Sequence, residues 1–69
     1  MIHPSNVEPG AVYLGEDGRV REVVEMSGYL ISYRPLPSGC KIGDPAFHMS
    51  RPAYIEKAEF CRWAKMELA

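Results

Sequence analysis

The stretch from Gly10 to Tyr33 constrains the fold more than any other part of the chain. It contains short runs of β-branched, aromatic and charged residues, separated by two glycine-containing turns at Asp17-Gly18 and Ser27-Gly28. Aspartate followed by glycine suits a type I turn ending in a left-handed glycine, and a two-residue connection suits a primed hairpin turn. The stretch therefore predicts an antiparallel meander of three strands, at residues 11–14, 19–26 and 29–33.

The second of these strands is expected to bend. Alternation of side chains along a strand puts Val20, Val24 and Met26 on one face and Val23 on the other. Glu22 interrupts the apolar face. A β-bulge near Glu22 reconciles these positions, and small barrels need such bent strands.

The segments outside the meander give weaker patterns. Residues 1–9 contain two prolines and predict an extended arm, because proline removes a backbone donor and fixes φ. The prolines and glycines of residues 34–45 predict a long irregular loop. A fourth strand is expected at residues 46–49, with Ser50 as the N-cap of a following helix.

The segment 51–69 is expected to be a single C-terminal helix, since residues 54–68 are rich in alanine, glutamate, lysine and methionine. At 100° per residue, its apolar residues occupy more than one side of that helix. One face carries Tyr54, Ala58, Cys61, Ala64 and Leu68, whereas Ile55, Trp63 and Met66 point away from it and Phe60 lies between. One side can cover the strands, which leaves the other for a partner.

These segments add up to one domain spanning residues 1–69, because a chain of this length has room for no more. The expected fold is mainly β with a C-terminal helix. We expect a small SH3-like antiparallel barrel, with the three-stranded meander and one or two weaker strands. Its expected parts are an arm at 1–9, a barrel at 10–50 and a helix at 51–69.

A series of residues between positions 10 and 55 also follows a recognisable order: Tyr13, Gly15, Asp17-Gly18, Val23-Val24, Ile31-Ser32-Tyr33, Leu36 and Arg51-Pro52. This order resembles that of a group of short, uncharacterised bacterial and phage proteins with an SH3-like β-barrel. The resemblance implies a fold and brings no catalytic residues. Arg21 stands where that group tends to have an aromatic residue.

Residues suited to catalysis or metal binding are few and widely spaced. The soft metal ligands are His3, Cys40, His48 and Cys61, and no two of them have the close spacing of a zinc site. Cys40 beside Lys41, with His48 as a base, is a combination that any small chain offers by chance. We therefore expect no enzyme activity, no cofactor, no metal site and no small-molecule substrate.

The compartment is inferred from the same composition. Two cysteines are too few for a disulfide scaffold, and the first residues have neither the basic nor the apolar region of a signal peptide. The longest apolar runs are too short to cross a membrane. These features predict a cytoplasmic protein with free thiols.

The leading functional hypothesis is an interaction module that contacts a protein partner or a second copy of itself, as in a homodimer. Tryptophan, phenylalanine and methionine are enriched at interfaces, and a thin core gains stability from association. The residues expected to make these contacts are Ile55, Phe60, Trp63 and Met66 on the helix, and Tyr29, Tyr33 and Arg34 at the strand edge.

The alternative is a weak nucleic-acid-binding module, because small barrels bind strands through aromatic rings beside basic side chains. The residues for this role are Arg19, Arg21, Tyr33, Arg34 and Lys41. A formal net charge of −1 argues against it, since phosphate contacts need a basic surface.

Overall fold

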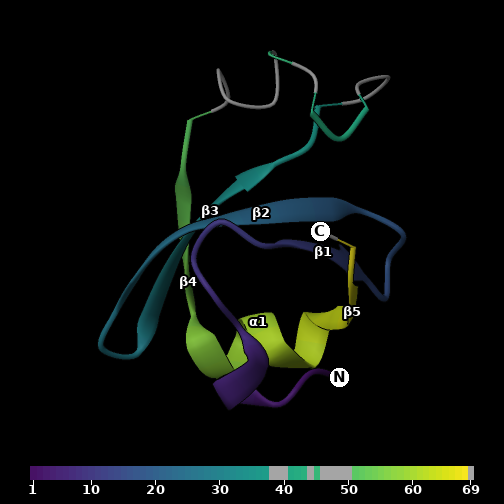
Figure 1. Cartoon of the computed structure of the whole chain (residues 1–69). Helices are drawn as coiled ribbons and strands as arrows, with labels where there is room; N and C mark the ends of the chain where they lie inside the picture. The colour runs from purple at the N-terminus through teal and green to yellow at the C-terminus, as the bar shows by residue number, and fades with distance from the viewer. Residues whose placement is uncertain (38–40, 44, 46–50, 69) are drawn as a thin grey trace.

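The computed structural model describes residues 1–37, 41–43, 45 and 51–68. A single 3-10 turn, η1, is followed by three strands, a fourth strand, a short helix and a fifth strand (Figure 1). The elements are η1 (Pro4–Asn6), β1 (Val12–Gly15), β2 (Val20–Ser27), β3 (Leu30–Pro35), β4 (Ala53–Glu56), α1 (Lys57–Trp63) and β5 (Ala64–Glu67).

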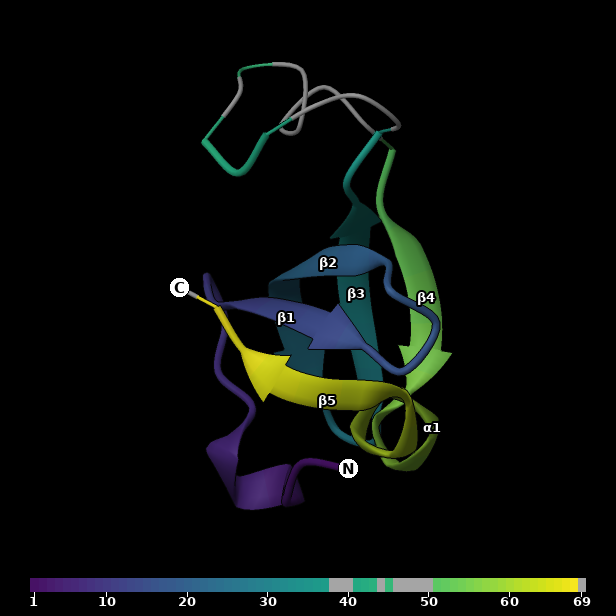
Figure 2. The same cartoon turned by 90° about the vertical axis from the view of Figure 1, so that its right-hand side faces the viewer.

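The five strands form one antiparallel sheet in the order β4-β3-β2-β1-β5. Figure 2 shows that the sheet coils, so that β3 and β4 cross the direction of β1 and β5. The two edge strands, β4 and β5, do not pair with each other, so the sheet is not closed. Helix α1 joins these two edges and lies under the concave face of the sheet (Figure 1).

The predicted meander is confirmed, with each strand beginning one residue later than expected. Gly18 has a φ of 80°, as the turn after Asp17 requires. The second connection is Gly28-Tyr29 rather than Ser27-Gly28, because Ser27 pairs with Leu30 across it. Glycine, with a φ of 59°, occupies the first loop position, which is the place it takes in a type II′ turn.

The predicted bend in the second strand is also present, two residues past its expected place near Glu22. The register of β2 against β3 shifts between Val23 and Glu25, which makes Val24 the extra residue. The shift lets Val23 and Met26 both face the core, although strict alternation would separate them. The prediction that Val20, Val24 and Met26 share the apolar face is therefore wrong, and Val23 is fully buried instead.

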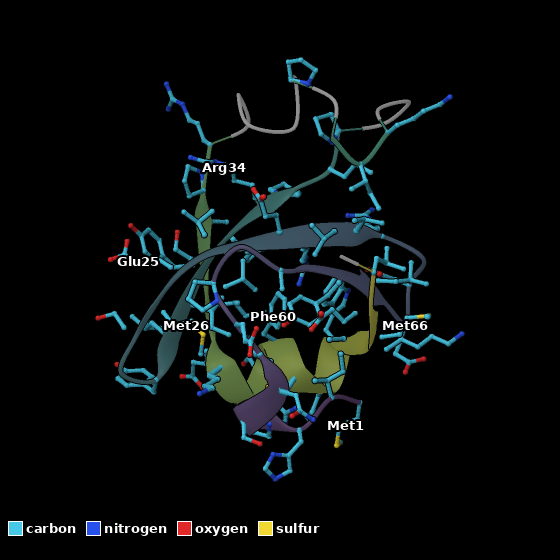
Figure 3. All side chains as sticks on the ribbon, in the orientation of Figure 1. Met1, Glu25, Met26, Arg34, Phe60 and Met66 are labelled. Carbon is cyan, nitrogen blue, oxygen red and sulfur yellow. The ribbon has the colours of Figure 1, made fainter. Side chains whose placement is uncertain are left out.

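The core lies between the concave face of the sheet and α1. Its largest fully buried side chains are Tyr13, Val23, Ile31 and Phe60, which come from β1, β2, β3 and α1. Phe60 points from the helix toward the sheet (Figure 3), and its ring meets Tyr13 edge-on at a centroid distance of 5.6 Å. Burying one such side chain stabilises the fold by about 1.5–3 kcal/mol.

The predicted helix over residues 51–69 is wrong in extent, because α1 covers only residues 57–63. The residues on either side pair with the two edges of the sheet, β4 with β3 and β5 with β1. Sheet pairing overrides helix propensity in β4 and β5, because these strands satisfy backbone hydrogen-bonding groups along β3 and β1. Three apolar residues expected on different sides of one helix, Ile55, Phe60 and Ala64, thus reach the same core from three elements.

The arm before β1 was expected to be extended. Instead it contains the 3-10 turn η1. It is tied to α1 by the amide of Ile2, which donates to the carbonyl of Cys61 at 3.0 Å. The predicted strand at 46–49 lies outside the described residues. In the described part of the chain, no helix is long and apolar enough to cross a membrane.

Candidate binding surface

The residues predicted to contact a partner do not gather on one surface. Phe60 is fully buried, so the prediction that it forms part of a contact surface is wrong, and Ile55 is partly buried against the core. Met66 is 48% exposed on edge strand β5, and Tyr29 is 70% exposed in the β2–β3 connection. Tyr33 and Trp63 are brought to the same place, since both lie beside Arg21.

Tyr33 and Trp63 are joined by Arg21, and the three side chains form what we call the Arg21 stack. The guanidinium carbon of Arg21 lies 4.1 Å from the centroid of the Trp63 ring and 4.5 Å from that of the Tyr33 ring. β2, β3 and the end of α1 each contribute one member. Cation–π contacts of this kind are worth about 0.5–2 kcal/mol, and more when water is excluded.

The stack continues the hydrophobic core outward. The Phe60 ring lies 5.2 Å from that of Trp63 and 6.2 Å from that of Tyr33, measured between centroids. Arg21 pairs with Tyr13 on β1, so its side chain leaves the sheet on the same face as that core residue. Its flat guanidinium packs beside the rings of Tyr33 and Trp63.

The β1–β2 loop also holds Trp63 in place, through hydrogen bonds to its side chain and its carbonyl. The indole Nε1 of Trp63 donates to Asp17 Oδ1 at 2.9 Å, and the same oxygen accepts from the Arg19 amide at 3.0 Å. These two hydrogen bonds, with the Arg19 amide as the larger cause, lower the pKa of Asp17 below its ordinary value. The Glu16 amide also donates to the Trp63 carbonyl at 2.9 Å.

Gly15 lets the Trp63 ring approach the backbone of β1. A Cβ at this position would lie 2.0 Å from Trp63 Cε2, well inside van der Waals contact. Gly15 is itself buried, and it pairs with Ala64 at the start of β5. The absence of a side chain at Gly15 therefore lets the Trp63 ring pack directly against the backbone of β1, where it also contacts Arg21.

A hollow of about 410 Å³ opens beside the stack. Two arginines and four uncharged residues line it: Arg19, Val20, Arg21, Tyr33, Pro35 and Leu36. Among the residues that the structure describes, no carboxylate lies within ion-pair distance of Arg19 or Arg21, although Asp17 interacts coulombically with Arg19. The hollow therefore has both cationic and apolar side chains in its lining.

Three of the residues named for nucleic-acid binding, Arg19, Arg21 and Tyr33, line this hollow. Arg34 does not join them, since it follows Tyr33 in β3 and its side chain leaves the opposite face of the sheet. There its Nη1 lies 3.9 Å from Glu22 Oε1, and both side chains are largely buried. Lys41 is exposed, beyond the end of β3.

A second hollow of about 440 Å³ lies between η1 and β5. It is lined by Ile2, Asn6, Glu8, Tyr13, Met66 and Glu67. The Tyr13 hydroxyl donates to the Asn6 carbonyl at 3.1 Å and accepts from the Glu8 amide at 3.0 Å. Burial raises the pKa of Tyr13, so the phenol stays neutral and holds the arm against β1.

Two of the remaining candidates for chemistry, His3 and Cys61, lie in the described part of the chain. Cys61 is buried and its burial raises the pKa of the thiol, which disfavours the reactive thiolate. His3 is exposed and shares a 2.6 Å hydrogen bond with the Ser5 hydroxyl. Cys40 and His48 lie outside the described residues. Within the described ranges, no three acidic, histidine or cysteine side chains gather as metal ligands do.

Comparisons of the chain with protein-family models, with curated proteins and with solved structures gave no match.

Proposed function

We propose that this protein is a non-enzymatic binding module that contacts a partner protein through the Arg21 stack and the adjoining hollow. The observation that carries the proposal is the position of Arg21. Its guanidinium is held between two aromatic rings, and it has no carboxylate partner among the described residues. An arginine placed in this way is oriented before any ligand arrives.

Two physical arguments support this use of the surface. Removing a cation from water is costly unless it is paired, and stacking offsets only part of that cost. A partner that supplies hydrogen-bond acceptors to Arg21 offsets more of it. Arginine, tyrosine and tryptophan are also the residues that dominate binding energy at protein interfaces, and this surface carries two arginines, one tyrosine and one tryptophan.

The proposal includes an SH3-like fold as the scaffold. Support comes from the antiparallel strand order β4-β3-β2-β1-β5, the bend in β2 and the coiling of the sheet around α1. The resemblance to short bacterial and phage SH3-like proteins is part of the same proposal. Arg21 then replaces an aromatic residue of that group without leaving the core face.

Nucleic-acid binding is the second candidate, because Arg19, Arg21 and Tyr33 line one hollow. Three features favour a protein partner instead. Arg21 already covers the Tyr33 and Trp63 rings on which a base would stack. Arg34 is paired with Glu22 on the other face, and the chain carries a net charge of −1. A continuous basic track for a phosphate backbone is therefore missing from the described surface.

The test is a selection of peptides from a random displayed library on the folded protein, followed by mapping of amide chemical shifts. The proposal predicts that selected peptides shift the signals of Arg21, Tyr33 and the Trp63 indole N–H. Shifts confined to the far end of the sheet, around Tyr29 and Tyr54, would contradict it. For the second candidate, a single-stranded oligonucleotide is titrated at two salt concentrations, because phosphate contacts weaken steeply with salt.

A further inference from the structure

Resting on the proposed function, we infer that the partner segment is an acidic peptide. A carboxylate of the peptide binds the guanidinium edges of Arg21 and Arg19, and a neighbouring apolar side chain occupies the hollow beside them. The inference concerns the chemistry of the ligand, so it can fail while the proposed surface stands.

Two aromatic rings limit the approach to Arg21. The centroids of the Tyr33 and Trp63 rings lie 4.5 and 4.1 Å from the guanidinium carbon, so each ring shields the guanidinium on its own side. The N–H donors of a guanidinium lie in its plane, so they point out of the stack at its edge. A carboxylate matches two parallel donors of such an edge and forms two charge-assisted hydrogen bonds with it.

Arg19 adds a second positive charge to the same hollow. Asp17 offsets part of the Arg19 charge, because the two side chains interact coulombically, although they form no ion pair. Glu16 lies 3.6 Å from the N-terminal amine. Arg21 has no ion pair with a described carboxylate, so its charge in particular favours an acidic group as the ligand.

The rest of the lining is apolar and defines the neighbouring position in the peptide. Val20, Pro35 and Leu36 contribute aliphatic surface beside the Tyr33 ring. A volume of about 410 Å³ is ample for one large side chain. An acidic residue next to a leucine, isoleucine or phenylalanine satisfies both halves of the hollow, whereas a phosphate backbone supplies nothing to the apolar half.

The experiment uses three fluorescently labelled peptides of equal length that alternate leucine with glutamate, glutamine or lysine, and one labelled thymidine oligonucleotide. Binding is followed by anisotropy of the label and by emission of Trp63, the single tryptophan of the chain. We expect saturable binding of the glutamate peptide, with Trp63 emission changing in parallel. The glutamine peptide should bind about tenfold more weakly or worse, since charged hydrogen bonds are lost.

Three variants locate the site. Arg21→Gln and Arg19→Gln should each weaken binding of the glutamate peptide, the former by about tenfold or more. Arg62→Gln makes the same chemical change at an exposed arginine outside the hollow and should leave the affinity unchanged. Arg21→Lys keeps the charge but loses the planar fork, so it should recover only a small part of the lost affinity. Circular dichroism of each variant confirms that the fold is retained.

The outcomes separate the two claims. Equal binding of the glutamate and glutamine peptides, with the same dependence on Arg21, would overturn the acidic ligand and leave the proposed surface intact. Binding of the glutamate peptide that is indifferent to Arg21→Gln would overturn the surface itself. Binding of the oligonucleotide alone would transfer the site to nucleic acid, and binding of no probe would overturn the acidic ligand.

Discussion

Arg21 links the core to the surface within a single side chain. Its position on the concave face of β2 is that of a core residue, yet its charged end borders a hollow. The Trp63 ring completes the stack because the β1–β2 loop and α1 both hold it. The geometry of the Arg21 stack therefore depends on the contacts that fix Trp63.

Gly15→Ala is predicted to destabilise the protein by about 1–3 kcal/mol, because the new methyl group overlaps the Trp63 ring. Urea unfolding measures the loss, and Trp63 emission should shift as the ring is displaced. Gly18→Ala is the matched control. It also introduces a methyl group, but into open space, so only the backbone strain of a left-handed residue remains. An unchanged Trp63 spectrum in Gly15→Ala would refute the close packing.

Acid should break the contact between Asp17 and Trp63. The folded-state pKa of Asp17 lies below the unfolded value of about 3.9. Its stabilising contribution is therefore complete above that value and is lost as pH falls through the folded pKa. Trp63 emission should change with a midpoint below about 3.9. In Asp17→Asn this acid transition should disappear, and a transition that persists there belongs to another group.

The elements divide into those that sequence patterns predict and those that need the whole fold. The meander was predictable because Asp17-Gly18 and Gly28 fix its two turns locally. The last third was not, because residues 53–67 have helix propensity and become strands only where β1 and β3 offer unpaired edges. The one-residue shift at Val24 likewise depends on pairing with β3, and it decides that Val23 is buried.

Two neighbouring substitutions in β4 distinguish the strand from the predicted helix. The helix would bury Tyr54 and expose Ile55, whereas the strand buries Ile55 against Ile31 and leaves Tyr54 74% exposed. Ile55→Ala is therefore predicted to cost about 2 kcal/mol of unfolding free energy. Tyr54→Ala should cost less than about 0.5 kcal/mol, as expected of an exposed site. The reverse order of the two losses in urea unfolding would contradict the strand.

The candidate site was only partly predictable for the same reason. Trp63 was named only for protein contact and Arg19 and Arg21 only for nucleic-acid binding, whereas Tyr33 belonged to both hypotheses. Nothing local in the sequence shows that the end of α1 returns to β2. The bond between Asp17 and Trp63 joins residues 46 positions apart. The one available indication was that Arg21 alternates with Val23, which puts both on one face.

For the whole molecule, one of the residues expected to make a dimer contact, Phe60, is buried within the chain. The open edges β4 and β5 are only four residues long and carry charged side chains, which are features that discourage edge pairing. We predict a monomer by light scattering across the micromolar range. A dimer that Met66→Glu dissociates would show instead that the exposed β5 edge is an interface.

The most direct test of the account is an NMR titration that observes the side-chain Nε–H signal of Arg21 as the leucine–glutamate peptide is added. If Arg21 receives the carboxylate, its signal shifts and saturates together with that of the Trp63 indole N–H, while the Nε–H signal of Arg62 stays in place. An Arg21 signal that does not move while the peptide binds elsewhere on the protein would contradict the account.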